Sequence, residues 1–342
     1  MRKLSAVALC LAFLTLFASC VGNNQNQGDQ NQSSPSDGLV ASYIPCGGAP
    51  VLISLCYNGQ QLVKSDGDNE LWYFDTEEIP TDEQKELLSA DTYDVYDFYS
   101  WRNEGTFTYA ELSSLSPYVK LATSSKADNF IPAYTHKQFD VNAQSGIDDD
   151  IREKIKAHIL DAGLTNTPVV ITEIWTCDID GDGTNEQLVH AQNYIYEYPL
   201  PDPEIGSEPI SNLEGLGFYN ILMLISDTLG NSVLSETILN VSEYDDLCFP
   251  GHSLPDTPYE DMEWRHALNV YFEDYFGQLR TFPMYACGEF MTFTENAPLV
   301  CDIDGDGAYE ICVLYGVEYM PAEIYEIENG ALRLSGRVIL PV

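Results

Sequence analysis

Two ten-residue segments of the chain repeat acidic residues and glycines at the same spacing, starting at Cys177 and at Cys301. Each reads Cys-Asp-Ile-Asp-Gly-Asp-Gly-x-x-Glu. Hard cations such as Ca²⁺ take about six to eight oxygen ligands, and carboxylates at alternate positions of a tight turn supply them. Without a cation, carboxylates about 5 Å apart would repel by roughly 3 kcal/mol per pair at an effective dielectric near 20. The pattern therefore predicts two calcium sites, with Ca²⁺ as the cofactor.

The expected ligands are the carboxylates at loop positions 1, 3, 5 and 9 and the backbone carbonyl at position 7. The first site would use Asp178, Asp180, Asp182, Thr184 and Glu186, and the second Asp302, Asp304, Asp306, Ala308 and Glu310. Glycines in each loop allow the backbone to turn sharply around an ion. Ion-free Asp-Gly turns are a common alternative, but two copies that both end in Glu favour calcium.

The segments after the loops predict strands, whereas an EF-hand loop continues into a helix. An EF-hand has a bidentate Glu at position 12, where this chain has Val189 and Val313. Residues 187–192 and 311–316 are rich in aliphatic and aromatic side chains, and extended runs over 169–176 and 289–300 precede the loops. Each loop is therefore predicted to join the two strands of a β-hairpin.

The loops resemble the calcium loops of the FG-GAP and VCBS repeat families. Their signature is Asp-x-Asp/Asn-Gly-Asp-Gly-x-x-Asp/Glu followed by an apolar strand, which matches both segments here. Those families stack many regularly spaced repeats into a β-propeller, whereas Asp178 and Asp302 lie 124 residues apart. The resemblance therefore implies calcium loops and argues against a propeller.

The elements around the loops suggest an internal duplication. Asp148 and the spacing of Ile151, Ile155 and Ile159 predict a helix that ends near Gly163, ahead of the first hairpin. A second helix is expected over 260–278, ahead of the second hairpin. Its apolar stripe is Trp264, Leu268, Tyr271, Phe272 and Tyr275.

A further hairpin is expected after each calcium hairpin, from 219–225 with 233–239 and from 322–327 with 331–340. Asn329 and Gly330 form a strong turn signal in the second of these. The sequence therefore predicts an α+β fold of antiparallel β-hairpins and meanders with packed helices and an internal duplication, rather than a β-propeller.

The amino-terminal region lacks a calcium loop. Short strands are expected over 51–55, 61–64 and 71–74, and a helix over 81–90. Aromatic side chains gather over 93–99 and at Trp101. They fit an aromatic core, the commoner case, or an exposed platform for a sugar or peptide.

The first residues indicate an extracytoplasmic lipoprotein. Arg2 and Lys3 precede an apolar run over 4–17, and Ala18 and Ser19 precede Cys20. This resembles a lipobox, with lipidation expected at Cys20, while an ordinary cleaved signal peptide is the alternative. The expected organisation is a signal peptide (1–19), a lipid-anchored flexible tether (20–38), an amino-terminal α+β region (39–140) and two repeats with calcium hairpins (141–240 and 241–342).

The net charge of −39 sets limits on the partners. A strongly negative field repels nucleic acid and anionic lipid headgroups, so nucleic acid is not an expected partner. The expected partners are the membrane, through the lipid anchor, and an extracellular protein or glycan. The bacterial cell envelope is the expected location.

The nine cysteines fit an extracytoplasmic protein without settling how they pair. Cys301 and Cys312 flank the second loop and are candidates for a disulfide across the hairpin. Buried free thiols are the alternative, because cysteine is among the most buried residue types.

No catalytic motif is present: the chain lacks Gly-x-Ser-x-Gly, His-Glu-x-x-His, Gly-x-Gly-x-x-Gly and a Walker loop. The five histidines are scattered without ligand spacing. We therefore expect a lipid-anchored, non-catalytic calcium-binding surface protein with a binding or adhesion role. The alternative is a secreted hydrolase or accessory module that acts on a glycan or peptide.

Overall fold

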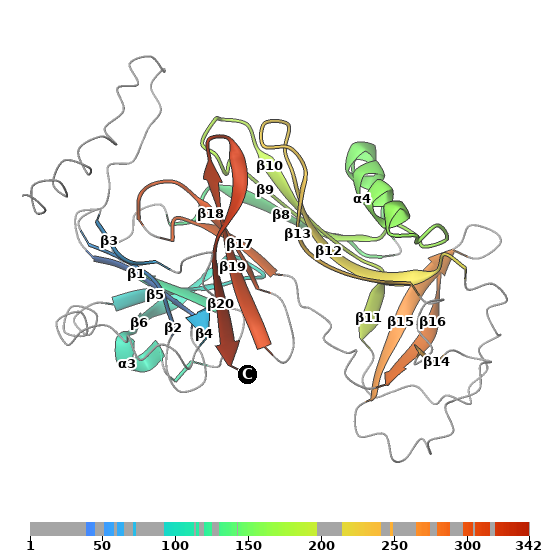
Figure 1. Ribbon diagram of the computed structural model, residues 1–342, viewed down its shortest axis with the longest axis horizontal. Coiled ribbons are helices and arrows are strands. Elements are labelled where there is room, and N and C mark those ends of the chain that lie inside the picture. Colours follow the sequence, from blue (N-terminus) through green and yellow to red (C-terminus); the bar gives the residue numbers. More distant parts are fainter. Residues whose placement is uncertain are drawn as a thin grey trace, which may run out of the picture. The chain divides into compact units, whose positions relative to one another are not determined.

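Antiparallel β-sheets make up most of the computed structural model, in which two helices also lie within the described residues (Figure 1). The structure describes residues 39–44, 51–57, 60–64, 71–72, 92–112, 114–115, 120–124, 130–141, 143–196, 214–240, 247–248, 265–273, 279–287, 297–303, 305–314 and 319–341. All of them belong to one compact unit, Ser34–Val342. The expected signal peptide, lipidation site, tether and 81–90 helix lie outside the described residues.

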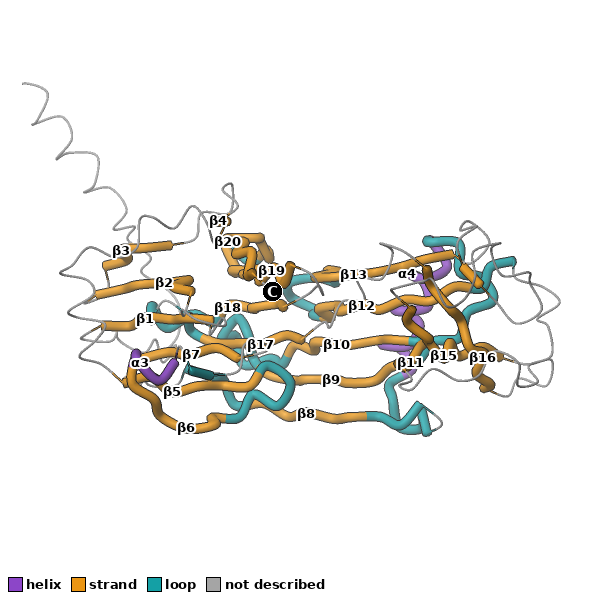
Figure 2. The backbone as a smooth tube through the Cα atoms, turned by 90° about the horizontal axis from the view of Figure 1, so that it is seen from below, coloured by secondary structure: helices purple, strands orange, loops and turns teal. Residues whose placement is uncertain are grey.

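The sheet that contains the first loop has the strand order β13-β12-β10-β9-β8, with every pair antiparallel. Figure 2 shows its strands side by side. Their bounds are β8 Tyr134–Gln138, β9 Ile171–Cys177, β10 Glu186–Gln192, β12 Gly217–Ile225 and β13 Ser232–Asn240. Both hairpins predicted around and after the first loop are confirmed.

Helix α4, Asp149–Asp161, packs on this sheet as the apolar spacing predicts. The side chain of Asp148 caps it by accepting the N–H of Asp150 at 2.9 Å. Ile151, Ile155 and Ile159 are buried in one cluster with residues of β9, β10 and β12. Gly163 follows the helix with a φ of +84°, where a side chain would strain the backbone.

The sheet that contains the second loop has the strand order β17-β18-β19-β20-β4. Its strands are β17 Ala297–Cys301, β18 Glu310–Leu314, β19 Tyr319–Glu328, β20 Ala331–Pro341 and β4 Leu71–Trp72. Only β4 runs parallel to its neighbour. Asn329, with a φ of +52°, and Gly330, with a φ of +71°, form the predicted turn between β19 and β20.

A third sheet corrects the second predicted helix. Residues 265–273 of the 260–278 segment form strand β15, Arg265–Glu273, which pairs along its whole length with β16, Leu279–Cys287. The helix prediction is wrong there because β-propensity and long-range pairing outweigh the helical spacing of a few aromatic residues. The sheet has the order β11-β15-β16-β14, with β11 Tyr194–Tyr196 and β14 Leu247–Cys248.

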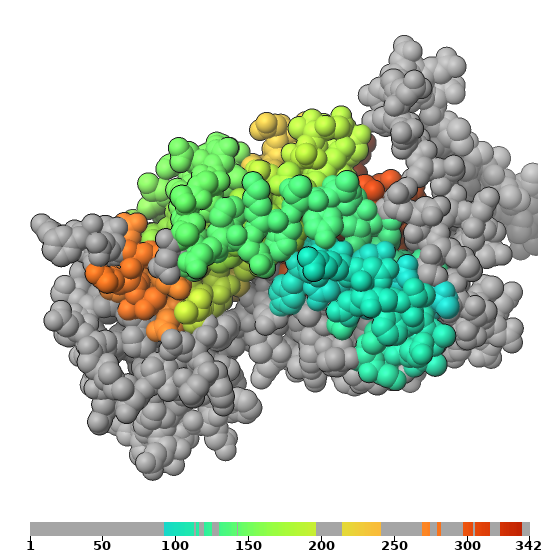
Figure 3. Space-filling model, turned by 180° about the vertical axis from the view of Figure 1, so that it is seen from behind, coloured from blue at the N-terminus to red at the C-terminus, as the bar shows by residue number. Residues whose placement is uncertain are grey.

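The amino-terminal sheet has the order β3-β2-β1-β7-β5-β6 and is antiparallel throughout. Its strands are β1 Leu39–Ile44, β2 Val51–Tyr57, β3 Gln60–Lys64, β5 Thr92–Asp97, β6 Asn103–Thr108 and β7 Lys120–Ser124, and the four-residue helix α3, Tyr109–Leu112, follows β6. On the face seen in Figure 3, residues 92–112 adjoin the surface of residues 130–196.

Most of the aromatic residues of the 93–101 segment are core residues. Tyr93, Phe98 and Trp101 are buried, and the Trp101 indole N–H donates to the carbonyl of Pro298 at 2.7 Å. Tyr96 and Tyr99 are partly buried against the buried cluster that contains Phe98 and Trp101. An aromatic core, rather than an exposed platform, therefore describes this segment.

Candidate metal centre

The first loop joins β9 and β10 at a point where the strand register brings its two ends together. Cys177 pairs with Glu186 as the last pair of the ladder, which leaves residues 178–185 outside the ladder. Ile179 turns inward and is buried, whereas residues 181–185 are exposed. Gly181 and Gly183 have φ values of +72° and +88°, so both use the left-handed conformation that the sharp turn requires.

The loop carboxylates accept the backbone N–H groups of their own loop. Glu186 accepts the N–H of Ile179 at 2.8 Å and Asp178 accepts that of Gly183 at 3.0 Å. Asp180 and Asp182 accept the N–H groups two residues further on, at 3.1 and 2.6 Å. These hydrogen bonds hold the acidic side chains inside the turn.

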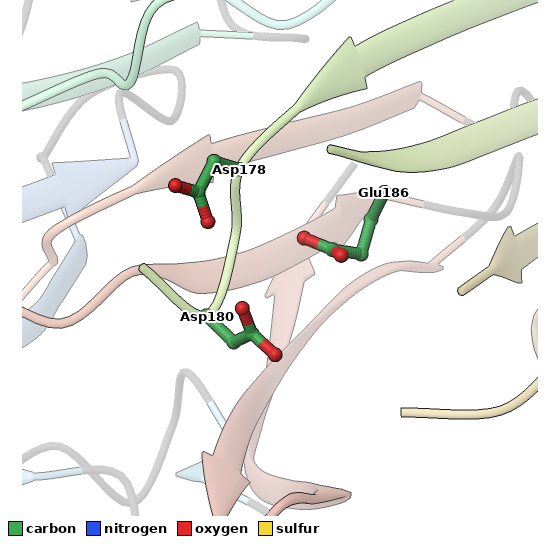
Figure 4. Close-up of side chains that lie close together, drawn as sticks. All are labelled: Asp178, Asp180 and Glu186. Atoms are coloured by element: carbon green, nitrogen blue, oxygen red, sulfur yellow. The ribbon is translucent and has the colours of Figure 1, made fainter. Parts of the chain in front are cut away.

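Three of the predicted ligands form a cluster that could hold a metal ion. One carboxylate oxygen from each of Asp178, Asp180 and Glu186 lies within 4.8 Å of the others. Figure 4 shows these carboxylates arranged around a common space. The Oδ1 atom of Asp178 is buried and has no hydrogen-bond partner, an arrangement that a bound cation would satisfy. Asp182 is not part of this cluster.

Electrostatics at the loop favour a positive ligand. Glu186 is only 1% exposed. Burial raises the pKa of Glu186, the Ile179 N–H acts in the opposite direction, and the charges of Asp180, Asp178 and Asp182 raise it further. A divalent cation would remove this repulsion, because it favours the ionised form of every carboxylate around it.

The neighbouring Cys177 is not equipped as a ligand or a nucleophile. Burial, with help from the charges of Glu186 and Asp178, raises the pKa of its thiol to about 12. The thiolate is the reactive form of cysteine, so Cys177 is an inert core residue at neutral pH.

The second loop repeats the hydrogen bonds of the first. Ile303 N–H donates to Glu310 at 2.7 Å, Gly307 N–H to Asp302 at 3.0 Å, and Ala308 N–H to Asp306 at 2.8 Å. Cys301 pairs with Glu310 just as Cys177 pairs with Glu186. Asp304, the predicted third-position ligand, lies outside the described residues.

One contact differs between the loops. In the second loop, both oxygens of Asp302 accept N–H groups, since Gly305 donates to Oδ1 at 2.7 Å and Gly307 to Oδ2. In the first loop, the Oδ1 atom of Asp178 is left open. Asp302 is also more buried than Asp178. The first loop is therefore the better preformed for a cation.

The turn between β12 and β13 adds a contact to the first loop that the sequence did not indicate. Thr228 donates from Oγ1 to Asp180 at 3.3 Å, and Ser226 holds the turn by accepting the N–H groups of Thr228 and Leu229. Thr228 lies 48 residues from Asp180, so no local motif connects them.

The two loops lie against the same hydrophobic core. Ile179 and Ile303 belong to one buried cluster, and Tyr309 of the second loop packs against it. Burial raises the pKa of Tyr309, and the charges of Asp302 and of Asp178 raise it further. The Tyr309 phenol is therefore within electrostatic reach of both loops.

The candidate disulfide residues are both buried, free thiols in this structure. Their Sγ atoms lie 4.0 Å apart. The register pairs Cys301 with Glu310 and Cys312 with Leu299, so the two cysteines are diagonal rather than directly opposite. Diagonal residues have Cα atoms about 7–8 Å apart, at the limit of what a disulfide spans. A disulfide here stays a prediction.

The described residues outside the loops do not bring together a pair of buried carboxylates. Among them the buried carboxylate is Glu323, which accepts the hydroxyl of Tyr325 at 2.6 Å. His190 contacts Thr172 and Asn220 through its two ring nitrogens. These groups have structural partners and do not form an acid–base pair.

In the part of the chain that the structure describes, no helix has the length and apolarity needed to cross a membrane. Comparison with protein-family models, curated proteins and solved structures finds no match to the chain.

Proposed function

We propose that the protein is a lipid-anchored, extracytoplasmic calcium-binding protein of a bacterial cell envelope. In this proposal, Ca²⁺ binds in both hairpin loops and stabilises the folded body, and the protein has a binding or adhesion role rather than a catalytic one. The observation that carries the proposal is the cluster of Asp178, Asp180 and Glu186 with its open carboxylate oxygen.

Calcium is the best match among the common divalent cations. Hard cations prefer oxygen ligands, and the cluster offers carboxylates and no thiolate or imidazole. Magnesium demands near-octahedral geometry and gives up its water reluctantly, whereas calcium tolerates the irregular ligand set of a loop. The resemblance to FG-GAP and VCBS loops supports the same ion.

The second site is proposed from the likeness of the loops. The two loops share sequence, strand register, glycine conformations and three equivalent N–H to carboxylate hydrogen bonds. The second loop would bind calcium through Asp302, Asp304, Asp306 and Glu310 with the carbonyl of Ala308. One oxygen of Asp302 would first release the backbone N–H that it accepts, so that it can bind the ion.

The two loops also occupy equivalent places in two four-stranded meanders, β9-β10-β12-β13 and β17-β18-β19-β20. We propose that these meanders arose by internal duplication. Helix α4 precedes the first meander and the β15–β16 hairpin precedes the second, so the duplicated part is the meander alone.

The test is calorimetric titration of the chelator-treated protein with calcium and then with magnesium, followed by thermal melts. We expect about two equivalents of calcium and weaker magnesium binding. Calcium at a hundredfold over Kd should stabilise the fold by about 2.7 kcal/mol per site. The double variant Asp180→Ala with Asp304→Ala should melt like the chelated protein. Absence of calcium uptake would disprove the proposal.

A further inference from the structure

A short backbone segment connects the first ligand positions of the two loops. The carbonyl of Phe130 accepts the N–H of Asp302, the first acidic residue of the second loop, at 2.9 Å. The chain then enters β8, where Tyr134 pairs with Cys177, the residue before Asp178. Residues 130–134, the bridging segment, therefore contact the base of both loops.

Side chains provide a second connection. Phe130, Ile179 and Ile303 belong to the same buried cluster, and Tyr309 and Tyr134 pack against it. Each isoleucine immediately follows the first acidic residue of its loop and donates its N–H to the closing glutamate. A loop that tightens around an ion therefore presses on packing that the other loop shares.

From these contacts we infer that the two loops form one coupled pair, in which calcium in either loop raises the affinity of the other. The inference rests on the proposed calcium binding. An ion in one loop orders the bridging segment and the shared core. The second ion then binds a loop whose surroundings are already ordered. Coupling between two binding sites is reciprocal, so the effect must be equal in both directions.

Repulsion between the bound ions acts against this coupling. Residues 181–185 are exposed, as are residues 306 and 307 of the second loop. Water and salt therefore screen the ions, over a Debye length of about 8 Å at physiological ionic strength. The packing connection passes through buried side chains and is not screened, so we expect positive coupling.

The experiment is calorimetric calcium titration of the full chain after chelation, for the wild type, Asp178→Ala and Asp302→Ala. Each variant removes a ligand from one loop and leaves the other loop complete. We expect the remaining loop to bind calcium at least about fivefold more weakly than it does in the wild type.

The control is Asp227→Asn, which removes an exposed charge in the turn beside the first loop without removing a ligand. It should bind two ions with wild-type affinity. If this variant weakens calcium binding as much as the other two variants, the loss of affinity results from the loss of one negative charge, and the coupling is disproved.

The possible failures are distinguishable. A wild type that binds no calcium would overturn the proposed function and the coupling with it. Uptake of two ions by the wild type, with unchanged or tighter binding in the remaining loop of each variant, would overturn the coupling alone. If circular dichroism shows that a variant is unfolded, Asp182→Ala or Asp306→Ala replaces it, because these two loop residues are exposed, and unchanged or tighter binding in the remaining loop would disprove the coupling.

Discussion

At the residue scale, the most informative groups are the acidic side chains whose burial is unfavourable without a cation. Glu186 is almost fully buried among other carboxylates, and it accepts a hydrogen bond from the backbone N–H of Ile179 in its own loop. A buried charge without a counter-charge destabilises a fold unless a metal or partner compensates it. The residue therefore has opposite effects on stability with and without calcium.

Replacement of Glu186 by Gln tests this directly. The amide oxygen can still accept the Ile179 N–H, but the charge is gone. In chelator we expect the variant to be more stable than the wild type by about 1 kcal/mol, because a buried charge is removed. At calcium a hundredfold over Kd the wild type gains about 2.7 kcal/mol from this site, so the variant should be less stable than the wild type by about 1.7 kcal/mol.

Urea unfolding in both buffers measures the two effects. Glu153→Gln, on the exposed side of α4, is the control and should change stability little in either buffer. A loss of equal size with and without calcium would show that Glu186 has only a structural role.

A second residue-scale prediction concerns pH. Burial lowers the pKa of His190 from 6.5, although its bond to Asn220 and the charge of Glu173 act the other way. The folded protein thus keeps His190 neutral while the unfolded chain protonates it. Above pH 6.5, His190 is neutral in both states and leaves the free energy of unfolding unchanged. As the pH falls below 6.5, the unfolded chain binds a proton that the folded protein does not, so the free energy of unfolding decreases.

The wild type should lose stability between pH 6.5 and 5 more steeply than His190→Gln, by up to about 1.4 kcal/mol per pH unit. Urea unfolding at several pH values measures the slope. Asn231→Ala, an exposed and non-titrating position in the turn between β12 and β13, is the control and should keep the wild-type slope. Equal slopes for the wild type and His190→Gln would contradict the prediction.

At the element scale, each candidate site is a β-hairpin whose connection replaces a simple turn. Ladder pairing between Cys177 and Glu186 sets the width of the first loop, and glycines at left-handed positions set its curvature. Helix α4 and strands β12 and β13 support the hairpin through packing rather than through ligands. Backbone conformation in the loop should therefore control cation affinity separately from overall stability.

Two glycines with matched surroundings separate these effects. Gly183 has a φ of +88° and Gly230 a φ of +79°, and a Cβ atom at either would meet nothing within 4 Å. Alanine at either position should destabilise the fold by about 1 kcal/mol through backbone strain alone. Gly183→Ala, but not Gly230→Ala, should also weaken calcium binding. Strain at position 183 displaces the backbone N–H that orients the ligand Asp178.

Thermal melts and calcium titration of the two variants provide the comparison. If Gly183→Ala binds calcium as tightly as Gly230→Ala, the conformation of the loop does not determine the affinity.

At the scale of the whole molecule, the proposed arrangement is a negatively charged calcium-binding body held at a membrane by an amino-terminal lipid. A net charge of −39 repels anionic headgroups, so the body itself should not hold the protein at a membrane surface. In this proposal, attachment depends on the lipid at Cys20.

Cys20→Ser should therefore release the protein from the membrane fraction. Cell fractionation with immunoblotting measures the distribution, and palmitate labelling reports the lipid. Cys10→Ser, within the apolar run, is the control and should leave the protein membrane-bound. A Cys20→Ser protein that still fractionates with membranes would place the anchor elsewhere.

The sequence by itself predicted the two loops, the hairpins around and after them, and helix α4. These features follow from short-range patterns: Asp and Gly spacing, strand runs beside turns, and isoleucines on one helical face. The structure confirms the hairpins and the helix, while the ion and the lipid anchor remain predictions. Local chemistry was sufficient there because each element is specified within about twenty residues of chain.

Only the tertiary structure decided how these elements combine. Residues 265–273 form a strand because their pairing with β16 outweighs the helical spacing of their apolar side chains. The strand register also makes Cys301 and Cys312 diagonal neighbours across the β17–β18 hairpin. The tertiary structure also brought Thr228 to the first loop and packed both loops against one core through the bridging segment. Contacts between residues far apart in the chain depend on how sheets pack, and no local pattern in the sequence records that packing.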